Sequence, residues 1–357
     1  MPAFVARAAR ALVSWALLCG GLACSSSGGS PSDGGTTAEA AHDANSEASS
    51  GSSGASSGGS GSGGSGGSDS GGIASSSGGD SGSLPVEGGA TADGGSPWMP
   101  SSAQPIHFHW QLSDDFAAAD LLPGQQGQVV YDVDGEHATA ADVVAIHGAG
   151  AKAICYVDVG TLEQGRSDYA QFPSSVVGPG VQGWPGENWL LVTAANQSVI
   201  LPLMQARFQG WCMAKGFDGV EPDNLDAFTN ISGVTEKDNL AYDLAIASMG
   251  HGMGFSMGLK NLLTDVSAGN VDSLLSGFDW ALVEQCYQYS ECSTYTRAGS
   301  FIALGKAVWD VEYGQVPACS DANGARMNAQ ERDLNLVAPP TSGYTYDPCV
   351  PDSQPTW

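Results

Sequence analysis

The sequence predicts an α/β protein whose folded part is a (β/α)8 barrel of the TIM type, preceded by an export signal and a disordered Ser/Gly tether. About 250 residues follow the Ser/Gly-rich part of the chain, which is the usual length of one such barrel. In that part, short apolar segments alternate with segments of helical spacing, as a parallel sheet with crossover helices requires. The apolar segments lack polar alternation, which is typical of strands buried on both faces.

The elements follow one another in a regular order along the folded part. We expect strands at 106–112, 128–134, 152–160, 219–224, 254–261, 279–286 and 306–313, with a further short strand at 189–192. We expect helices at 139–150, 200–216 and 235–252. Gly216 lies at the end of the second helix, where glycine commonly forms the C-cap. Seven or eight such units close a barrel.

The first 24 residues have the three-part layout of a secretory signal. Arg7 and Arg10 are followed by an apolar run, 11–18, and then by small residues. The run is too short to span a membrane as a helix of the mature protein. Cys24 follows Leu-Ala and resembles the acylated cysteine of a bacterial lipoprotein, so lipid anchoring and plain secretion both stay open. We expect a secreted, periplasmic or outer-surface protein.

Residues 25–98 are dominated by serine and glycine. Such a segment cannot bury enough apolar surface to offset its ordering entropy, and we expect a disordered tether with a root-mean-square span of about 50 Å. The remaining segment, 99–357, is then one domain. It carries 30 acidic and 10 basic side chains, a formal charge of −20. This charge excludes nucleic acid as a natural partner and favours a cationic ligand.

Six cysteines remain when Cys19 and Cys24 are assigned to the signal. An even number after an export signal predicts disulfides, although six cysteines allow about 15 pairings. Cys286 and Cys292 enclose a short loop, and Cys319 and Cys349 enclose the C-terminal segment, which leaves Cys155 with Cys212. The spacing has no CxxC and no paired histidines, so we expect no metal site and no cofactor.

Polar residues stand at the ends of successive predicted strands, where a barrel of this type forms its active site. They are Asp132, Asp158, Asp223, Asn224, Lys260, Asn261, Glu284, Gln285, Glu312 and Tyr313. The densest stretch is GFDGVEPDNLD at 216–226, with four carboxylates and no basic residue. Glu221 and Asp223 are two positions apart and therefore face the same way on a strand.

Several segments together resemble the endo-α-1,4-polygalactosaminidases, glycoside hydrolase family 114. The segments are ICYVDVG, RSDYAQFP, WPGENWL, GFDGVEPDN, MGLKN and VEQCYQYSEC, in this order, and the resemblance runs from about Trp110 to Cys349. It implies a (β/α)8 barrel that cleaves α-1,4-linked galactosamine polymers, which are cationic when deacetylated. The tether lies outside the resemblance.

Glycoside hydrolysis requires two carboxyl groups, one that protonates the leaving oxygen and one that attacks the sugar or activates water. By resemblance to the aspartate of VEPDN, Asp223 is the nucleophile, with Glu221 as its alternative, and Glu284 is the acid/base. We expect retention of configuration. The residues expected to bind substrate are Trp110, Asp132, Tyr156, Asp158, Glu221, Asn224, Lys260, Asn261, Glu312 and Tyr313. His107 and His109 are expected to be core histidines.

Two other classes of function stay open. The first is a hydrolase or deacetylase of another amino-sugar or uronic polysaccharide. The second is a catalytically inactive, carbohydrate-binding barrel on a tether. Whichever of these functions the protein has, we expect it to be a monomer.

Overall fold

The computed structural model describes residues 97–315, 319–351 and 356–357. The predicted signal with Cys24 and all but the last two residues of the predicted tether lie outside this part of the chain. No helix among the described residues is long and apolar enough to cross a membrane.

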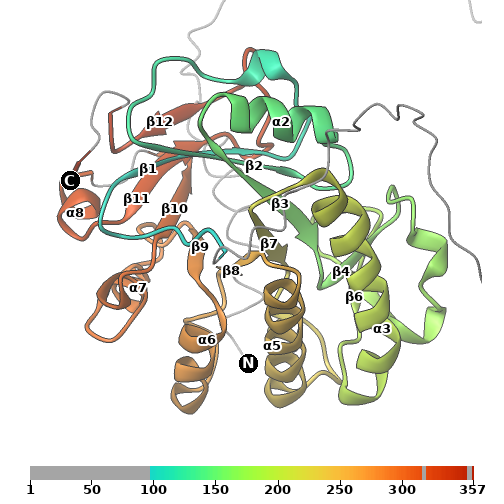
Figure 1. The fold of residues 1–357 in the computed structure, drawn as a ribbon. Coiled ribbons are helices and arrows are strands. Elements are labelled where there is room, and N and C mark those ends of the chain that lie inside the picture. The colour runs from blue at the N-terminus through green and yellow to red at the C-terminus, as the bar shows by residue number, and fades with distance from the viewer. Residues whose placement is uncertain (1–96, 316–318, 352–355) are drawn as a thin grey trace, which may run out of the picture. The chain divides into compact units, whose positions relative to one another are not determined.

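Eight parallel strands form the wall of a nearly closed barrel (Figure 1). They are β1 (Ile106–Gln111), β2 (Gln128–Asp134), β3 (Lys152–Asp158), β7 (Gly219–Asp223), β8 (Ser256–Lys260), β9 (Trp280–Glu284), β10 (Val308–Tyr313) and β11 (Asn328–Arg332). A ninth strand, β12 (Tyr346–Pro348), pairs with β11 antiparallel. The prediction of a TIM-type barrel is therefore confirmed.

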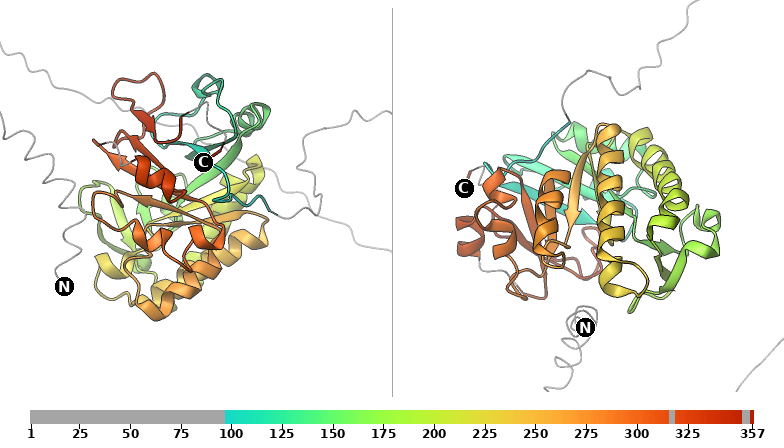
Figure 2. Two further views of the ribbon diagram at one scale, coloured as in Figure 1. Left: turned by 90° about the vertical axis from the view of Figure 1, so that its left-hand side faces the viewer. Right: turned by 90° about the horizontal axis from the view of Figure 1, so that it is seen from below.

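Helices cover the outside of the sheet (Figures 1 and 2). They are α2 (Ala140–Gly148), α3 (Ala194–Arg207), α4 (Ala227–Asn230), α5 (Glu236–Gly252), α6 (Val271–Gly277), α7 (Ser293–Thr296) and α8 (Cys319–Gly324). Between them lie a π turn, η4 (Phe208–Cys212), and the 3-10 turns η1 (Ala118–Asp120), η2 (Tyr169–Gln171), η3 (Ser174–Val176), η5 (Met213–Lys215), η6 (Ala268–Asn270) and η7 (Ile302–Leu304). Thr139 and Thr235 cap α2 and α5 by accepting from backbone N–H groups of the first turn. Gly216 ends the helical segment after α3 with a φ of 87°, as predicted.

The seven predicted barrel strands are confirmed to within two residues at each end. The predicted strand at 189–192 overlaps β6 (Glu187–Leu190) but is not part of the barrel. With β4 (Thr161–Glu163) and β5 (Val177–Gly180) it forms a separate antiparallel sheet in the order β4-β6-β5. This sheet, here called the insertion, lies between β3 and α3 in sequence and therefore starts at the carboxyl end of a barrel strand. The eighth barrel strand is β11, which the sequence analysis missed.

Two apolar cores lie on either side of the barrel wall. The larger core lies between the sheet and the helices, and the smaller one fills the barrel with side chains that include Trp110, Trp280 and Trp309. Gly258 on β8 makes room for this filling, because a Cβ there would lie 2.3 Å from the Trp280 ring. The barrel is thus a packed core with its polar groups concentrated toward one end.

One side chain bridges the open seam between β1 and β11. The backbone N–H of Ile106 donates to the Asn328 side-chain oxygen at 2.7 Å, and the Asn328 amide nitrogen donates to the Val308 carbonyl at 3.2 Å. The amide of Asn328 therefore replaces a backbone ladder between the first and last parallel strands.

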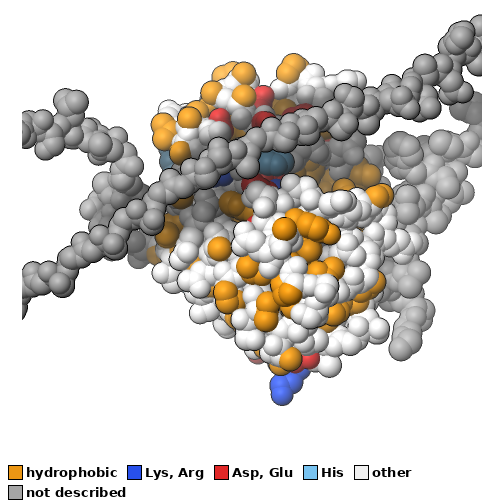
Figure 3. Space-filling view, turned by 90° about the vertical axis from the view of Figure 1, so that its right-hand side faces the viewer, with side chains coloured by type: hydrophobic (Ala, Val, Ile, Leu, Met, Phe, Trp, Pro, Cys, Tyr) orange, Lys and Arg blue, Asp and Glu red, His pale blue; other side chains and the backbone are white. Residues whose placement is uncertain are grey.

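Three disulfides fix the outer parts of the chain. They are Cys155–Cys212, Cys286–Cys292 and Cys319–Cys349, the pairing that the sequence predicts. Where the drawing leaves the surface uncovered, Figure 3 shows hydrophobic side chains in small separate groups. This is the ordinary distribution of apolar side chains on a protein surface.

Candidate active site

Side chains that point into the barrel bring most of the predicted site residues together at the carboxyl ends of the strands. Alternate residues of a strand face the same side. On β9, Trp280 and Leu282 pack in the barrel core, so Glu284 follows them on the inner face. By the same alternation Lys260 is on the inner face of β8, because Met257 and Leu259 pack in the outer core.

Lys260 is the centre of this group. Its Nζ lies 3.0 Å from Asp223 Oδ1, 3.1 Å from Glu221 Oε1 and 3.4 Å from Glu284 Oε2. Burial alone would lower the pKa of Lys260, but the charges of these three carboxylates outweigh burial and raise the pKa well above its usual value. The side chain is therefore a buried ammonium ion at neutral pH.

Asp223 and Glu284 are the two carboxylates of this group that solvent reaches, with 20% and 28% of their side chains exposed. The second oxygen of Asp223 accepts from the Tyr156 hydroxyl at 3.0 Å. Glu284 accepts from the Tyr313 hydroxyl at 2.5 Å and from the Asn261 amide at 3.1 Å. Each carboxylate is therefore held from two sides and open on another.

Glu221, Trp110 and Asp132 lie beneath the accessible surface. Glu221 and Asp132 are fully buried, and Trp110 is 2% exposed. The Trp110 Nε1 donates to Glu221 Oε2 at 2.9 Å, and Lys260 Nζ lies 4.5 Å from the center of the Trp110 ring. These side chains support the group from below.

Burial favours the protonated forms of two carboxyl groups in this layer, Glu221 and Asp132. Burial raises the pKa of Glu221 to about 7, with Asp223 adding to the rise and the Lys260 ammonium opposing it. Burial and the charge of Glu221 raise the pKa of Asp132 well above its usual range.

Asp158 organises the loops at the ends of β3 and β7. Its carboxylate accepts from the backbone N–H of Gly160 at 3.0 Å and of Thr161 at 2.8 Å, and from the Asn224 side chain at 2.9 Å. A Cβ on Gly160 would lie 1.7 Å from the Asn224 carbonyl oxygen, so this close approach requires glycine. Asn224 is the first residue after β7 and has a φ of 59°, a left-handed conformation that asparagine tolerates.

Glu312 and Tyr313 face opposite sides of β10 because they are adjacent in one strand. Tyr313 points to Glu284, as described above. Glu312 points to the loop after β9 and accepts from the backbone N–H groups of Tyr287 at 2.7 Å and Gln288 at 3.3 Å. The Glu312 carboxylate therefore holds the loop that begins after Glu284.

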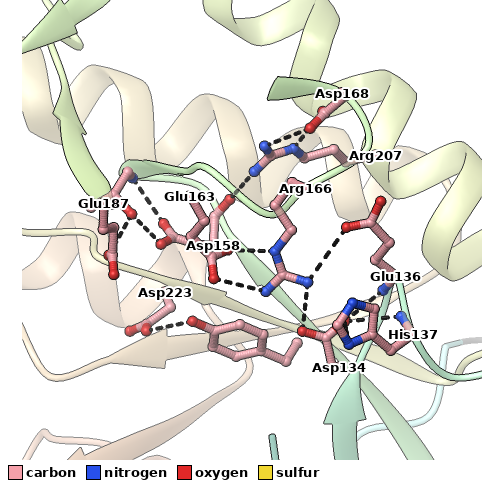
Figure 4. Close-up of polar contacts among 12 residues, drawn as sticks. Asp134, Glu136, His137, Asp158, Glu163, Arg166, Asp168, Glu187, Arg207 and Asp223 are labelled. Carbon is pink, nitrogen blue, oxygen red and sulfur yellow. Dashed lines mark hydrogen bonds and ion pairs between the residues drawn. The ribbon is translucent and has the colours of Figure 1, made fainter. Parts of the chain in front are cut away.

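Sequence reasoning missed the ion pairs that join the insertion to the barrel (Figure 4). Arg166 contacts Glu163 in two hydrogen bonds and lies 2.6 Å from Asp134 at the end of β2. Arg207 of α3 binds Asp168 in two hydrogen bonds and donates to the Asp158 carbonyl oxygen at 2.7 Å. Both arginines were visible in the sequence, Arg166 in RSDYAQFP and Arg207 in the predicted helix, but Asp134 and Asp168 are distant from them in sequence.

Glu187 of the insertion is a further acidic group near the rim. Its carboxylate accepts from the Thr161 hydroxyl at 2.6 Å, and burial, with the charges of Glu163 and Asp223, raises its pKa. The Thr161 hydroxyl also contacts Asp158, so Glu187 lies close to the loops at the ends of β3 and β7.

The histidines of β1 lie on the outer side of the barrel wall. His107 and His109 are buried and hydrogen-bonded to Gln126 and Gln125, as expected of core histidines. Among the described residues, the one cluster with metal-ligand geometry is Cys286, Cys292 and Asp310. Its two sulfur atoms form a disulfide, so this cluster is not a metal site.

The fold agrees with the comparison to known families. The model of glycoside-hydrolase family GH114 matches residues 89–344. The chain belongs to this family. Membership makes the protein a glycoside hydrolase by descent and confirms the resemblance seen in the sequence.

Two solved structures are similar to this chain. Ega3 from Aspergillus fumigatus, solved in complex with galactosamine, is 27% identical and has a TM-score of 0.57, with coverage of 71% of this chain and 98% of that chain. The glycoside hydrolase domain of PelA from Pseudomonas aeruginosa is 14% identical with a TM-score of 0.47, over 64% of this chain and 95% of that domain. No curated protein sequence matches the chain.

Proposed function

We propose that this GH114 member is an endo-acting hydrolase of α-1,4-linked galactosamine polymers, with Asp223 as nucleophile and Glu284 as acid/base. The observation that carries the proposal is the pair of open carboxylates on either side of Lys260. Because Asp223 Oδ1 and Glu284 Oε2 contact one nitrogen atom at 3.0 and 3.4 Å, they are at most 6.4 Å apart. Carboxyl groups about 5–5.5 Å apart are typical of retaining enzymes, and about 6.5–9.5 Å of inverting ones.

The exposed fractions support Asp223 over Glu221 as nucleophile. A nucleophile must reach the anomeric carbon, and the fully buried Glu221 has no surface from which to do so. Its two oxygens are also occupied by Trp110 and Lys260. We assign Glu221, with Asp132 and Trp110, to the support of Lys260.

The other predicted binding residues divide into two groups. Tyr156, Asn261 and Tyr313 are partly exposed and touch the reacting carboxylates, so they can contact a sugar at the same time. Asp158 and Glu312 are occupied by backbone N–H groups and hold loops. We therefore propose that these two carboxylates hold the loops at the ends of the strands and do not bind substrate.

Two observations support a cationic amino-sugar polymer as substrate. Ega3, with 27% identity over nearly its whole length, was solved with galactosamine bound. The segment 99–357 of this chain has a formal charge of −20, which attracts a polycation.

The test measures the release of reducing ends from purified polygalactosamine by the wild type and by Asp223→Asn, Glu284→Gln and Glu221→Gln. The first two changes are expected to lower turnover by about 10²–10⁴-fold or more, while polymer binding survives, because the lost groups act mainly in the transition state. Glu221→Gln, two residues away on the same strand, is the matched control and should keep measurable turnover.

Other outcomes assign other functions. A dead Glu221→Gln with an active Asp223→Asn would reverse the assignment of the nucleophile. Release of acetate without reducing ends would indicate a deacetylase, and cleavage of glucosamine or galacturonan polymers alone would indicate another substrate. Polymer binding without any product would indicate an inactive carbohydrate-binding barrel.

We further propose that the protein is exported and acts from a tether. Three disulfides within the described domain support an oxidising compartment. The layout of residues 1–24 and Cys24 is that of an export signal, with or without a lipid anchor.

A further inference from the structure

We infer that Lys260 is a positioning residue whose ammonium group is the shared counter-ion of both reacting carboxylates through the whole reaction. The inference rests on the proposed function and extends it to a third residue. Its basis is geometric, because one buried nitrogen atom lies within 3.4 Å of Asp223 and Glu284 at the same time.

Retaining hydrolysis moves one negative charge between these two carboxylates. In the first step an Asp223 oxygen bonds to the anomeric carbon, the bond from that carbon to the leaving oxygen breaks with its electrons on the oxygen, and the oxygen takes the proton of Glu284. Asp223 becomes a neutral ester while Glu284 becomes an anion. The charge of the pair is unchanged, but it has moved from one side of Lys260 to the other.

The second step returns the charge. A water oxygen bonds to the anomeric carbon and gives its proton to Glu284, and the bond to Asp223 breaks with its electrons on the aspartate. In both states the anion lies beside the same ammonium ion. A fixed charge that serves both states avoids reorganisation during the reaction, which is the main advantage of preorganised electrostatics.

The surroundings of Lys260 hold it in this position. Glu221 binds it from below at 3.1 Å, and the Trp110 ring faces it at 4.5 Å. Only 4% of the Lys260 side chain is exposed, so water screens its charge weakly. The titratable groups that face this cluster are Asp132 on β2, Tyr156 on β3, Glu221 and Asp223 on β7, Glu284 on β9 and Tyr313 on β10.

The test compares Lys260→Met, which keeps the length of the side chain and removes its charge, with Lys260→Arg, which keeps a charge. For Lys260→Met we expect kcat to fall by about 10²–10³-fold, as for loss of one preorganised donor. Both limbs of the bell-shaped pH profile should move to higher pH, because carboxylic acids hold their protons longer without a neighbouring cation. Lys260→Arg should keep both limbs near their wild-type positions.

Lys306→Met is the matched control. Lys306 is a partly buried lysine that precedes β10 at the opposite end of the barrel and donates to the carbonyl oxygens of Leu275 and Phe278. Its loss should lower stability and leave the pH profile in place. Equal shifts in both methionine variants, or an unshifted profile in Lys260→Met, would overturn the inference.

A second measurement does not depend on turnover. Side-chain carboxyl carbons of the intact protein can be titrated by ¹³C NMR in the wild type and in Lys260→Met. We expect the carboxyl resonances of the three residues that Lys260 contacts, Glu221, Asp223 and Glu284, to move to higher pH in the variant, and unchanged curves for Asp223 and Glu284 would refute the shared counter-ion. If the wild type releases no reducing ends, the proposed function fails while this measurement still decides the role of Lys260.

Discussion

Glu221 offers a prediction about stability that can be separated from activity. Replacing it by glutamine keeps the shape of a fully buried side chain and removes a group that titrates. In the wild type, burial raises the pKa of Glu221 from an ordinary 4.5 to about 7. In an unfolded chain the same group has its ordinary pKa, so the folded and unfolded states bind different numbers of protons between these values.

The direction in which the free energy of unfolding changes with pH follows from this difference in bound protons. Between pH 4.5 and 7 the folded protein holds the proton of Glu221 and the unfolded chain has lost it, so the free energy of unfolding falls as pH rises. At about 1.4 kcal/mol per pH unit, the full effect is about 3 kcal/mol. The glutamine variant lacks this loss. The free energy of unfolding of Glu221→Gln minus that of the wild type should therefore increase by about 3 kcal/mol between pH 4 and pH 8.

Urea unfolding followed by circular dichroism at pH 4, 5.5, 7 and 8 measures this difference directly. Glu331→Gln is the matched control, because Glu331 lies on β11, is partly exposed and stands outside the group around Lys260. The difference in the free energy of unfolding between Glu331→Gln and the wild type should not change with pH. A difference that stays flat for Glu221→Gln as well, or one that favours the wild type increasingly at high pH, would refute the reasoning.

Two further predictions concern the charge and the N-terminus. The apparent second-order rate constant on polygalactosamine should fall as the salt concentration rises, because the screening length shrinks to about 8 Å at physiological ionic strength. A rate constant that does not change with salt would mean that the acidic charge serves only the solubility of the protein. If Cys24 is acylated, Cys24→Ala should move the protein from the membrane fraction to the soluble fraction, and mass spectrometry of the mature N-terminus should show a lipid on the wild type only.

The barrel could be predicted because its signals are local. Seven strands are short apolar runs, and each ends in polar residues that the alternation of a strand carries to one end of the barrel. The proposed reacting pair, Asp223 and Glu284, stands on two of these strands. Family motifs added the roles of Asp223 and Glu284, which spacing alone does not assign.

The missed parts lack such local signals. β11 reads NAQER, with a single apolar residue, and it forms a strand because β10 and β12 pair with it on both sides. The insertion contains β5, which reads VGPG and has no strand propensity of its own. The loop-holding roles of Asp158 and Glu312 depend on backbone N–H groups whose direction only the fold fixes.

Several of the few basic residues of the domain make internal contacts. Of the 10 lysines and arginines in segment 99–357, Arg166, Arg207 and Lys260 are buried and bound to carboxylates. Lys215 and Lys306 donate to backbone carbonyl oxygens. Basic side chains are sparse in the uncovered part of Figure 3. These cations hold the insertion, the loops and the proposed reacting pair in place, and the segment keeps a formal charge of −20 after they are counted. The same composition thus provides rigid internal ion pairs and a surface field that favours a cationic substrate.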